Sequence, residues 1–409
     1  MTSSVFAPPA NDGPAPQMKA AGSPPLLSGL RLVEISAYIA APLGGATLAA
    51  LGADVIRVDP PGGGIDIGRW PLHNGRSLYW AGLNQGKRSV TIDMRSEAGR
   101  RQASRLITAA GEGGGIFLTN LPAIGWSSYE ELSRLRSDLI MVVITGSRDG
   151  GTAVDYTVNA SLGFPLITGP EGHAGPVNHV LPAWDAMTGF LAATAILGAE
   201  RHRRLTGKGQ LVELSLADVG LAIAGHLGFI AEAQITEEPR GRFGNYVYGS
   251  FGRDFATKDC RSVMVLALTP RQWKALGQAT GLAGQFTEIE ARLGVDLSAE
   301  GDRWRTRTEI SALLGSWIGQ RDLAEVGDLF EAAGVLWGPY QSFKELIASR
   351  TMTSAPRRLV DEVEHPGLGR YLTVGSPIRF GANAALPPQA APGLGQHTAE
   401  VLREFGLEE

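Results

Sequence analysis

LRLVEISAYIAAPLGGATLAALGADVIRVD, residues 30–59, is the stretch of the sequence that decides the fold. Residues 30–36 are a strand-like apolar run, and residues 42–52 suit a helix that ends at a glycine C-cap. Residues 53–59 are a second strand-like run. The order strand, helix, strand is the right-handed crossover that builds a parallel sheet, and such sheets bind ligands beyond the carboxyl ends of their strands.

The pattern of strands and helices continues along the chain and predicts the α/β class. A long helix is expected over 185–202, with a basic last turn, RHRR, that suits the negative end of the helix dipole. The composition changes near 225 and near 350, which indicates a separate middle region. The other expected elements are strands at 88–94, 115–119, 138–146 and 262–268, helices at 97–110, around 270–280, at 303–333 and at 397–406, and two β segments about the HPGLG turn within 360–380.

Composition and charge describe an ordinary globular chain of 409 residues, 44% hydrophobic and 19% charged. A net charge of −4 gives no general attraction to nucleic acid or to an anionic membrane, so neither is an expected partner. The longest apolar stretch, 186–199, is shorter than the roughly 20 residues that cross a bilayer. The single cysteine, Cys260, fits a reducing cytoplasm, and residues 1–26 have the Pro, Ala, Gly and Ser content of a flexible tail.

Three common kinds of site are disfavoured by the sequence. Residues 37–48, AYIAAPLGGATL, lack the G-x-G-x-x-G of a nicotinamide-binding turn. The seven histidines are scattered and no pair has the spacing of a zinc motif, so no metal site is expected. The G-x-S-x-G elbow of a serine hydrolase is also missing.

One carboxylate has two interpretations. Asp185 lies in LPAWDAMTG, residues 181–189, at the start of the long expected helix. Asp is a favoured N-cap, and such a cap contributes about 1 kcal/mol. A carboxylate at a helix N-terminus is also kept ionised by the partial positive charge there, and an ionised carboxylate can act as a nucleophile. Pattern alone leaves both roles open.

Six segments, in this order along the chain, resemble the class III CoA-transferases, the CaiB/BaiF-like family. The resemblance runs from about residue 27 to the C-terminus, and the order of the segments makes it specific. They are LSGLRLVEISAYIAAPLGGATLAALGADVIRVDPPGGG, LNQGKRSVTIDMRSEAGR, LPAWDAMTGFLAATAILGAERHRRLTGKGQLVELSLAD, GVLWGPYQSFKEL, HPGLG and GQHTAEVLREFG.

The resemblance implies an architecture that periodicity does not suggest. A large Rossmann-like, CoA-binding catalytic domain would form from both chain ends, residues 27–225 and 350–409. Residues 226–349 would supply linkers and a smaller middle α/β domain. Two such chains would thread through each other as an interlocked, ring-like homodimer.

The resemblance also implies roles for particular residues. In the V-x-D-x-x-x-G segment of the family the Asp is the catalytic nucleophile, and it matches Asp185, which would form an aspartyl anhydride and then an aspartyl-CoA thioester. No cofactor beyond the coenzyme A carried by the substrate, and no metal, is required. Family positions near CoA match Ile39, Arg57, Lys87 and Arg88, although the three cations could also be solvated surface charge.

Three further runs, 146–170, 177–185 and 244–257, look like a subgroup that moves CoA between the C1 and C4 carboxyls of one mesaconate molecule. The substrate would then be the CoA thioester of a C5 dicarboxylic acid. Val154 stands where racemases of the family carry a histidine, so racemisation is not expected. An intermolecular CoA-transferase and a catalytically silent CoA-binding protein remain as alternatives. Candidate holders of the second carboxylate are Arg148, Asn245, Tyr246, Tyr248 and Arg253, and candidate oxyanion donors are the backbone amides of Gly244 and Gly249.

Overall fold

The computed structural model describes residues 24–109, 111–349, 352, 354, 359–383 and 385–408. The chain divides into two compact units. Unit 1 takes the described residues of Met1–Val158, Leu181–Ile223 and Ala355–Glu409, and unit 2 takes those of Asn159–Val180 and Ala224–Ser354. The expected flexible tail, residues 1–26, lies outside the described residues except for its last three.

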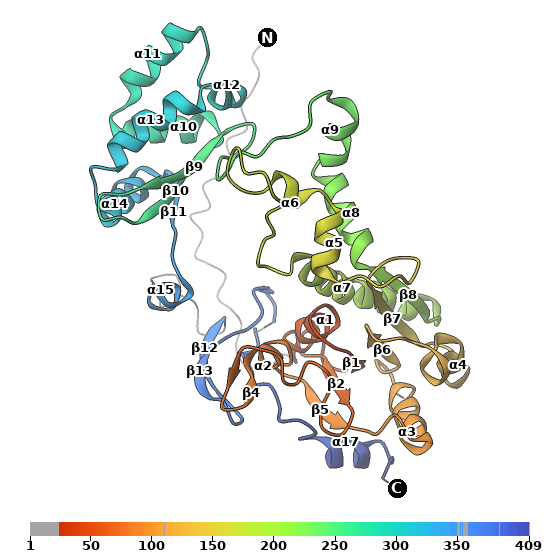
Figure 1. The fold of residues 1–409 in the computed structure, drawn as a ribbon. Coiled ribbons are helices and arrows are strands. Elements are labelled where there is room, and N and C mark those ends of the chain that lie inside the picture. Colours follow the sequence, from red (N-terminus) through yellow and green to blue (C-terminus); the bar gives the residue numbers. More distant parts are fainter. Residues whose placement is uncertain are drawn as a thin grey trace. The chain divides into compact units, whose positions relative to one another are not determined.

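Unit 1 is built on a six-stranded parallel sheet in the order β5-β2-β1-β6-β7-β8 (Figure 1). Numbered along the chain within this sheet, the order is 3-2-1-4-5-6, the doubly wound order of dinucleotide-binding folds. The predicted α/β class with a parallel sheet is therefore confirmed. The strands are β1 (Arg31–Ile35), β2 (Asp54–Asp59), β5 (Arg88–Thr91), β6 (Ile116–Thr119), β7 (Ile140–Thr145) and β8 (Gln210–Ser215).

Side chains that alternate along these strands fill two separate cores, one on each face of the sheet. One face packs on α1 (Ala40–Ala49) and α7 (Ala183–Thr206), where Leu32, Leu118 and Val142 are buried. The other face packs on α3 (Glu97–Ile107) and α17 (Thr398–Glu404), where Val33, Phe117 and Met141 are buried. Burial on both faces explains why the strands are continuous apolar runs.

The C-terminal segment completes unit 1 beside the edge strand β5. The amide of Ser89 donates to His397 Nδ1 at 3.1 Å, and that of Thr91 donates to Thr398 Oγ1 at 3.0 Å. The side chains of Val401 and Leu407 are buried in the same core as α3. The remaining elements of unit 1 are β3 (Leu72–His73), β4 (Arg76–Ser77), α2 (Leu78–Leu83), the 3₁₀ turn Gly125–Ser127, α4 (Tyr129–Leu135), β12 (Val360–His365) and β13 (Gly369–Val374).

Unit 2 has a three-stranded antiparallel sheet in the order β11-β10-β9 with helices packed on it. Its core contains Phe251, Val265, Leu276, Leu314 and Phe330. The elements are α6 (Phe164–Ile167), α9 (Phe229–Ile235), β9 (Phe251–Ala256), β10 (Ser262–Ala267), α10 (Pro270–Thr280), α11 (Ala283–Leu293), α12 (Glu300–Arg305), α13 (Arg307–Ile318), α14 (Leu323–Ala333), β11 (Leu336–Pro339) and α15 (Phe343–Ala348). Two helices, α5 (Asp155–Ser161) and α8 (Leu216–His226), run from one unit into the other.

Several expected elements differ from the structure in detail. The helix predicted at 303–333 is three helices, because Thr306 leaves the helical region and the chain turns between Gly319 and an extended Asp322. The segment Asn159–Val180 belongs to unit 2, whereas the sequence interpretation places it in the large domain. The reason is local, since Gly244 donates its amide to Gly169 O at 3.0 Å and Arg242 donates to Leu166 O at 2.8 Å.

Among the described residues, no single helix has the length and apolarity to cross a membrane. The pair α8 and α9, bent by 63° at the break between them, passes that test of length and composition only when the two are taken together. Neither helix alone does so.

Candidate active site

The helix that carries Asp185 begins two residues earlier than expected. α7 starts at Ala183, its N-cap position is Pro182, and Asp185 lies in the first turn. The prediction that Asp185 is the N-cap is therefore wrong. A residue outside the helix satisfies the free backbone amides at the start of α7. Asp155 Oδ2 accepts from Trp184 N at 2.8 Å and from Asp185 N at 3.1 Å.

The surroundings of Asp185 raise its pKa to about 6. Burial is the main cause, and the negative charge of Asp155 adds to it, while the positive charge of Arg69 opposes both. The helix N-terminus does not prevent this rise, but the expectation that the carboxylate stays ionised still holds at pH 7. At pH 7 the carboxylate is still mostly ionised, and its higher basicity makes it a better nucleophile than an ordinary Asp side chain.

Two residues of the segment between β2 and β5 lie within electrostatic reach of Asp185. Arg69 lowers the pKa of Asp185, and Asp185 in turn helps to raise that of Tyr79. The pKa of Tyr79 is about 12, mainly because the phenol is buried, so the hydroxyl stays protonated. That hydroxyl is buried, and Arg69 lies close enough to act on its oxygen as a hydrogen-bond donor. Because an arginine cannot accept, the O–H is left available near the carboxylate.

The carboxyl ends of β1 and β6 meet at the point where the strand order reverses. Ala37, after β1, donates its amide to Asn120 Oδ1 at 2.8 Å, and Asn120 Nδ2 donates back to Ala37 O at 2.7 Å. This pair joins the two loops that follow the strands. In doubly wound sheets the crevice at this position is where ligands bind.

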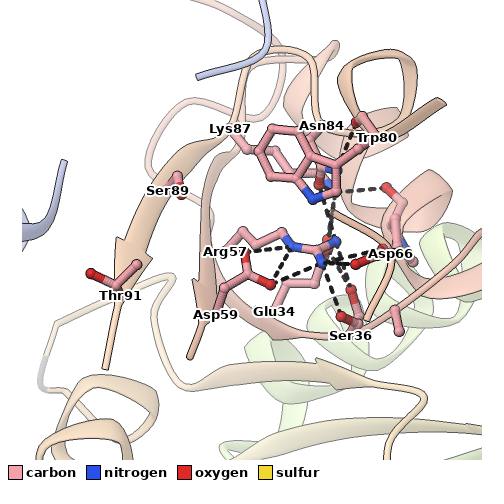
Figure 2. A network of polar contacts seen from close by, with 12 residues as sticks. Glu34, Ser36, Arg57, Asp59, Asp66, Trp80, Asn84, Lys87, Ser89 and Thr91 are labelled. Atoms are coloured by element: carbon pink, nitrogen blue, oxygen red, sulfur yellow. Dashed lines mark hydrogen bonds and ion pairs between the residues drawn. The ribbon is translucent and has the colours of Figure 1, made fainter. Parts of the chain in front are cut away.

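A buried network of charges lies directly beneath the loop after β1 (Figure 2). The Arg57 guanidinium is fully buried and pairs with Glu34 at 3.5 Å, Asp59 at 3.0 Å and Asp66 at 3.2 Å. Arg57 Nη2 also donates to Ser36 O at 3.0 Å. Because every one of these partners is itself buried, the network fixes the backbone that leads from β1 to α1.

Lys87 belongs to the same network. Its Nζ donates to both oxygens of Glu34 at 2.9 Å, to Pro42 O at 2.8 Å and to Asn84 Oδ1 at 2.9 Å. Burial lowers the pKa of Lys87 to about 8, against the opposing charge of Glu34. The Glu34 carboxylate leaves no room for a side chain at Gly45, where a Cβ would lie 1.9 Å from Oε2. The carboxylate therefore packs directly on the α1 backbone.

Comparison with known proteins identifies the family. Residues 27–398 match the model of CoA-transferase family III. The chain belongs to that family. It is 56% identical over 387 residues to a 2-methylfumaryl-CoA isomerase of Chloroflexus aurantiacus, covering 94% of this chain and 95% of the relative. It is 27% identical to a succinyl-CoA:mesaconate CoA-transferase of Haloarcula marismortui, over 93% of this chain and 97% of that one.

A solved structure supports the fold of this family member. A CAIB/BAIF family protein from Brucella suis matches with a TM-score of 0.77 at 24% identity, over 94% of this chain and all of that chain. At this level of identity the likeness concerns the fold alone. The family resemblance of the sequence is thus confirmed at the level of both sequence and fold.

The four predicted CoA contacts all lie in unit 1. Ile39 is the N-cap residue of α1, at the end of the loop after β1. Arg88 pairs with Asp54 at 2.5 Å and with Glu404 at 2.6 Å, so it ties β5 to β2 and α17. The alternative that Arg57 and Lys87 are solvated surface charge is wrong, because both are buried with their donors paired. Binding of CoA by these residues stays a prediction.

Most of the predicted substrate holders gather in unit 2. Gly244, Asn245, Tyr246 and Arg253 line one open pocket, and Arg253 Nη1 donates to Tyr246 Oη at 3.0 Å. The Tyr248 hydroxyl donates to Glu232 Oε1 at 3.2 Å, and its ring packs on Phe243 and Trp304. Gly244 and Gly249 both have a positive φ. Their proposed roles toward the substrate stay predictions.

Arg148 differs from these residues. It lies in unit 1, it is largely exposed, and its Nε donates to Asp218 at 3.0 Å. An exposed pair of this kind is weak and can open for a ligand. Among the described residues, no group of three or more His, Cys, Asp or Glu side chains is arranged to hold a metal ion.

Sequence reasoning missed four residues that shape the surroundings of Asp185. Asp155 satisfies the start of α7 but was not among the candidate site residues of the sequence. Arg69, Tyr79 and Tyr38 lie in loops or a short helix and have no periodicity that marks them. The Glu34 in an otherwise apolar strand was the available signal for the buried network, because a charge in a buried strand needs a partner.

Proposed function

We propose that the protein is a mesaconyl-CoA isomerase, which moves CoA between the C1 and C4 carboxyls of one mesaconate molecule and so converts 2-methylfumaryl-CoA to 3-methylfumaryl-CoA. The observation that carries this proposal is the 56% identity to 2-methylfumaryl-CoA isomerase over almost the whole length of both chains. The family match adds that CoA thioesters are the class of substrate.

The first half of the reaction uses Asp185 as nucleophile. A carboxylate oxygen of Asp185 attacks the thioester carbonyl carbon, the C–S bond breaks, and CoA leaves as the thiolate while an aspartyl anhydride forms. The thiolate then attacks the Asp185 carbonyl of the anhydride. The C–O bond to the acyl group breaks, which releases free mesaconate and leaves Asp185 as the CoA thioester. No proton has to be moved in either step.

The second half repeats these steps with the other carboxylate. Mesaconate reorients within the site, and its second carboxylate attacks the carbonyl carbon of the Asp185 thioester, so that the C–S bond breaks, the thiolate leaves and an anhydride forms again. The thiolate then attacks the mesaconyl carbonyl carbon, and the C–O bond to Asp185 breaks, which gives 3-methylfumaryl-CoA and regenerates the Asp185 carboxylate. A retained diacid meets the thioester at an effective concentration of about 10⁵ M or more in favourable intramolecular cases, far above any bulk acceptor. Retention of the diacid thus replaces the binding of a separate acceptor.

The raised pKa of Asp185 supports this role. A carboxylate whose pKa is about 6 is ionised at pH 7 and more basic than an ordinary Asp side chain, so it attacks better. The burial that raises the pKa also limits the access of water to Asp185, and water would hydrolyse either intermediate.

We propose that the working form is a homodimer in which the two chains are threaded through each other. The exposed apolar helix α9 supports an interface with a second copy, because none of its seven residues is buried. CoA contacts at Ile39, Arg57, Lys87 and Arg88 belong to the same proposal, as do the substrate and oxyanion contacts in unit 2.

Labelled free acid tests the intramolecular step. Unlabelled 2-methylfumaryl-CoA is converted in the presence of excess ¹³C-mesaconate, and the product is analysed by mass spectrometry. We expect 3-methylfumaryl-CoA without label. Label in the product would instead favour an intermolecular transferase, the alternative that the similarity to a succinyl-CoA:mesaconate CoA-transferase raises.

Removal of the nucleophile separates catalysis from binding. Asp185→Ala should keep the fold and the affinity for CoA but lose at least about 10³-fold in turnover, the scale of loss when a catalytic nucleophile is removed. Glu97→Gln is the matched control, since Glu97 is an exposed acid in the first turn of α3. Turnover retained by Asp185→Ala would remove the assignment of the nucleophile.

A further inference from the structure

Arg69, the cation that acts on Asp185, is held between two aromatic rings. The guanidinium carbon of Arg69 lies 5.3 Å from the centre of the Tyr38 ring and 5.1 Å from that of the Tyr79 ring. Stacking between two aromatic faces fixes the plane of a guanidinium and leaves its edge groups free to donate. Arg69 itself is exposed, so a ligand can reach those edge groups.

Arg69 has no carboxylate partner within the described part of the chain. The nearby acids of the buried network, Asp59 and Asp66, pair with Arg57 instead. Asp185 acts on Arg69 only through space, without an ion pair. A positioned arginine without an anionic partner, beside a nucleophile, is a site for an anionic group of the substrate.

The buried network and α2 hold the two tyrosine rings in position. Tyr38 has a φ of 64°, a conformation unfavourable for a residue with a side chain, and its amide donates to Asp66 Oδ2 at 3.0 Å. Asp66 in turn accepts from Arg57 Nη2 at 3.2 Å, so the buried network of Figure 2 fixes the first ring. The second ring, Tyr79, is carried by α2.

The backbone of Arg69 is fixed to the same two supports. Its amide donates to Asp66 O at 3.1 Å, and its carbonyl accepts from the hydroxyl of Ser77. Ser77 is the N-cap residue of α2, where its side chain accepts from Trp80 N. These contacts hold Arg69 and both rings in fixed positions relative to one another, which is what a binding group near a reacting carboxylate requires.

We propose that Arg69, together with the Tyr79 hydroxyl, binds the free carboxylate of the acyl group while Asp185 reacts with the thioester. This inference rests on the proposed function and names the residue that selects an acyl group with a second, free carboxylate. The Tyr79 hydroxyl is buried and protonated, and its O–H has no acceptor among the described residues, so it can donate to the same carboxylate. After the first half-reaction the same contact retains the free diacid.

The test measures affinity for two thioesters that carry the same CoA. Asp185→Ala, which cannot form the anhydride, serves as the background, and calorimetry gives dissociation constants for mesaconyl-CoA and for crotonyl-CoA, which has no free carboxylate. Adding Arg69→Met should weaken mesaconyl-CoA about tenfold to a hundredfold, the worth of a charge-assisted hydrogen-bonded contact, and leave crotonyl-CoA unchanged. Tyr79→Phe should weaken mesaconyl-CoA by a smaller factor.

Controls separate this inference from its alternatives. Arg134→Met removes an exposed arginine of α4 that pairs with Glu131, and it should change neither affinity. Equal weakening of both thioesters by Arg69→Met would place a phosphate of CoA at Arg69 and overturn the inference. Unchanged affinity for mesaconyl-CoA would overturn it as well. Circular dichroism of each variant shows whether the fold is kept.

The proposed function is judged by a different result. If the enzyme without substitutions fails to isomerise 2-methylfumaryl-CoA, the proposed function fails whatever Arg69 does. If it isomerises and Arg69→Met shows no preference between the two thioesters, only the role of Arg69 fails. Arg69→Lys adds a last readout, because a single ammonium replaces the planar fork and should recover only part of the loss.

Discussion

Asp185 and Asp155 are two carboxylates whose environments give them different tasks. Asp155 is almost fully buried and uses Oδ2 to accept two amides at the start of α7. Its negative charge is the second cause, after burial, of the raised pKa of Asp185. Asp155 therefore positions the start of α7 and raises the basicity of Asp185, the proposed nucleophile.

The pH dependence of turnover tests this role of Asp155. Because Asp185 must be ionised to attack and its pKa is about 6, activity should rise with pH through about 6. Asp155→Asn keeps an oxygen that can accept both amides but removes the charge, so the pKa of Asp185 should fall and the acid limb of kcat should move to lower pH. A structural role alone would not move that limb.

The companion variant Asp155→Ala separates charge from capping. It should move the acid limb in the same direction and, in addition, lower the free energy of unfolding by about 0.5–2 kcal/mol, the cost of a lost cap. Urea unfolding of both variants measures the difference. An acid limb that stays in place in both would show that Asp155 does not set the basicity of Asp185.

At the residue scale the sequence could single out Asp185 as the candidate nucleophile but not what surrounds it. Asp185 was found through the order of family segments, whereas its expected capping role was wrong because Asp155, 30 positions earlier, satisfies the amides. Arg57 and Lys87 were singled out as CoA contacts, which stays a prediction. Their buried partners Glu34 and Asp66 come from separate segments, and only the folded chain brings them together.

At the scale of elements, α1 and α7 pack closely against each other, near the start of α1. Two glycines allow this approach. A Cβ at Gly44 would lie 3.1 Å from Gly189 O, and one at Gly189 would lie 2.8 Å from Ala40 O. Gly189 is also the glycine of the family's V-x-D-x-x-x-G segment, so close packing gives that position a physical reason.

A matched pair of glycine substitutions on α7 tests this contact. Gly189→Ala should lower the free energy of unfolding by about 1–3 kcal/mol, because its Cβ would also come within 3.0 Å of Leu43 Cβ and the helices would have to separate. Gly198→Ala, on the same helix with no atom within 4 Å, should raise stability by about 0.5–1 kcal/mol.

Urea unfolding gives both values, and turnover gives a second readout. Gly189→Ala should also reduce kcat, since moving α7 moves Asp185, while Gly198→Ala should leave kcat unchanged. If Gly189→Ala and Gly198→Ala had equal stability and activity, the close approach of α1 and α7 would not be the reason for the glycine at position 189.

Four strands of the parallel sheet in unit 1 were predicted well. The strands at 30–36, 53–59, 115–119 and 138–146 were confirmed within one or two residues, because their apolar runs fill two cores. The breaks within 303–333 were missed, since amphipathic periodicity continues across a turn that Gly319 and Asp322 make.

At the scale of the whole molecule, unit 1 is discontinuous in sequence and needs its C-terminal segment. Sequence composition indicated breaks near 225 and 350 but not which pieces pair. The pairing is set by contacts of long range, such as Gln102 Nε2 donating to Leu407 O at 2.8 Å and the amide of Ser89 donating to His397. Long-range contacts leave no local pattern in the sequence, so the family resemblance was the only guide to the connection.

Exposed apolar side chains at α9 are the surface that a second copy would cover in the proposed homodimer. Ile235, the last residue of α9, is 82% exposed, and Leu227, just before this helix, is 64% exposed. Exposed apolar side chains of this kind are costly to leave in water when no partner covers them. The proposed homodimer would bury them, which predicts that a charge at this position weakens association.

Ile235→Asp should therefore raise the dissociation constant of the dimer at least tenfold, since burying an isoleucine contributes about 1.5–3 kcal/mol and tenfold corresponds to about 1.4 kcal/mol. Gln234→Glu is the matched control, because it adds the same charge at the adjacent exposed position without removing an apolar side chain. Analytical ultracentrifugation over a range of concentrations measures both constants. A protein that is monomeric without any substitution would contradict the dimer itself, whereas a dimer equally tight with Asp at position 235 would place its interface away from α9.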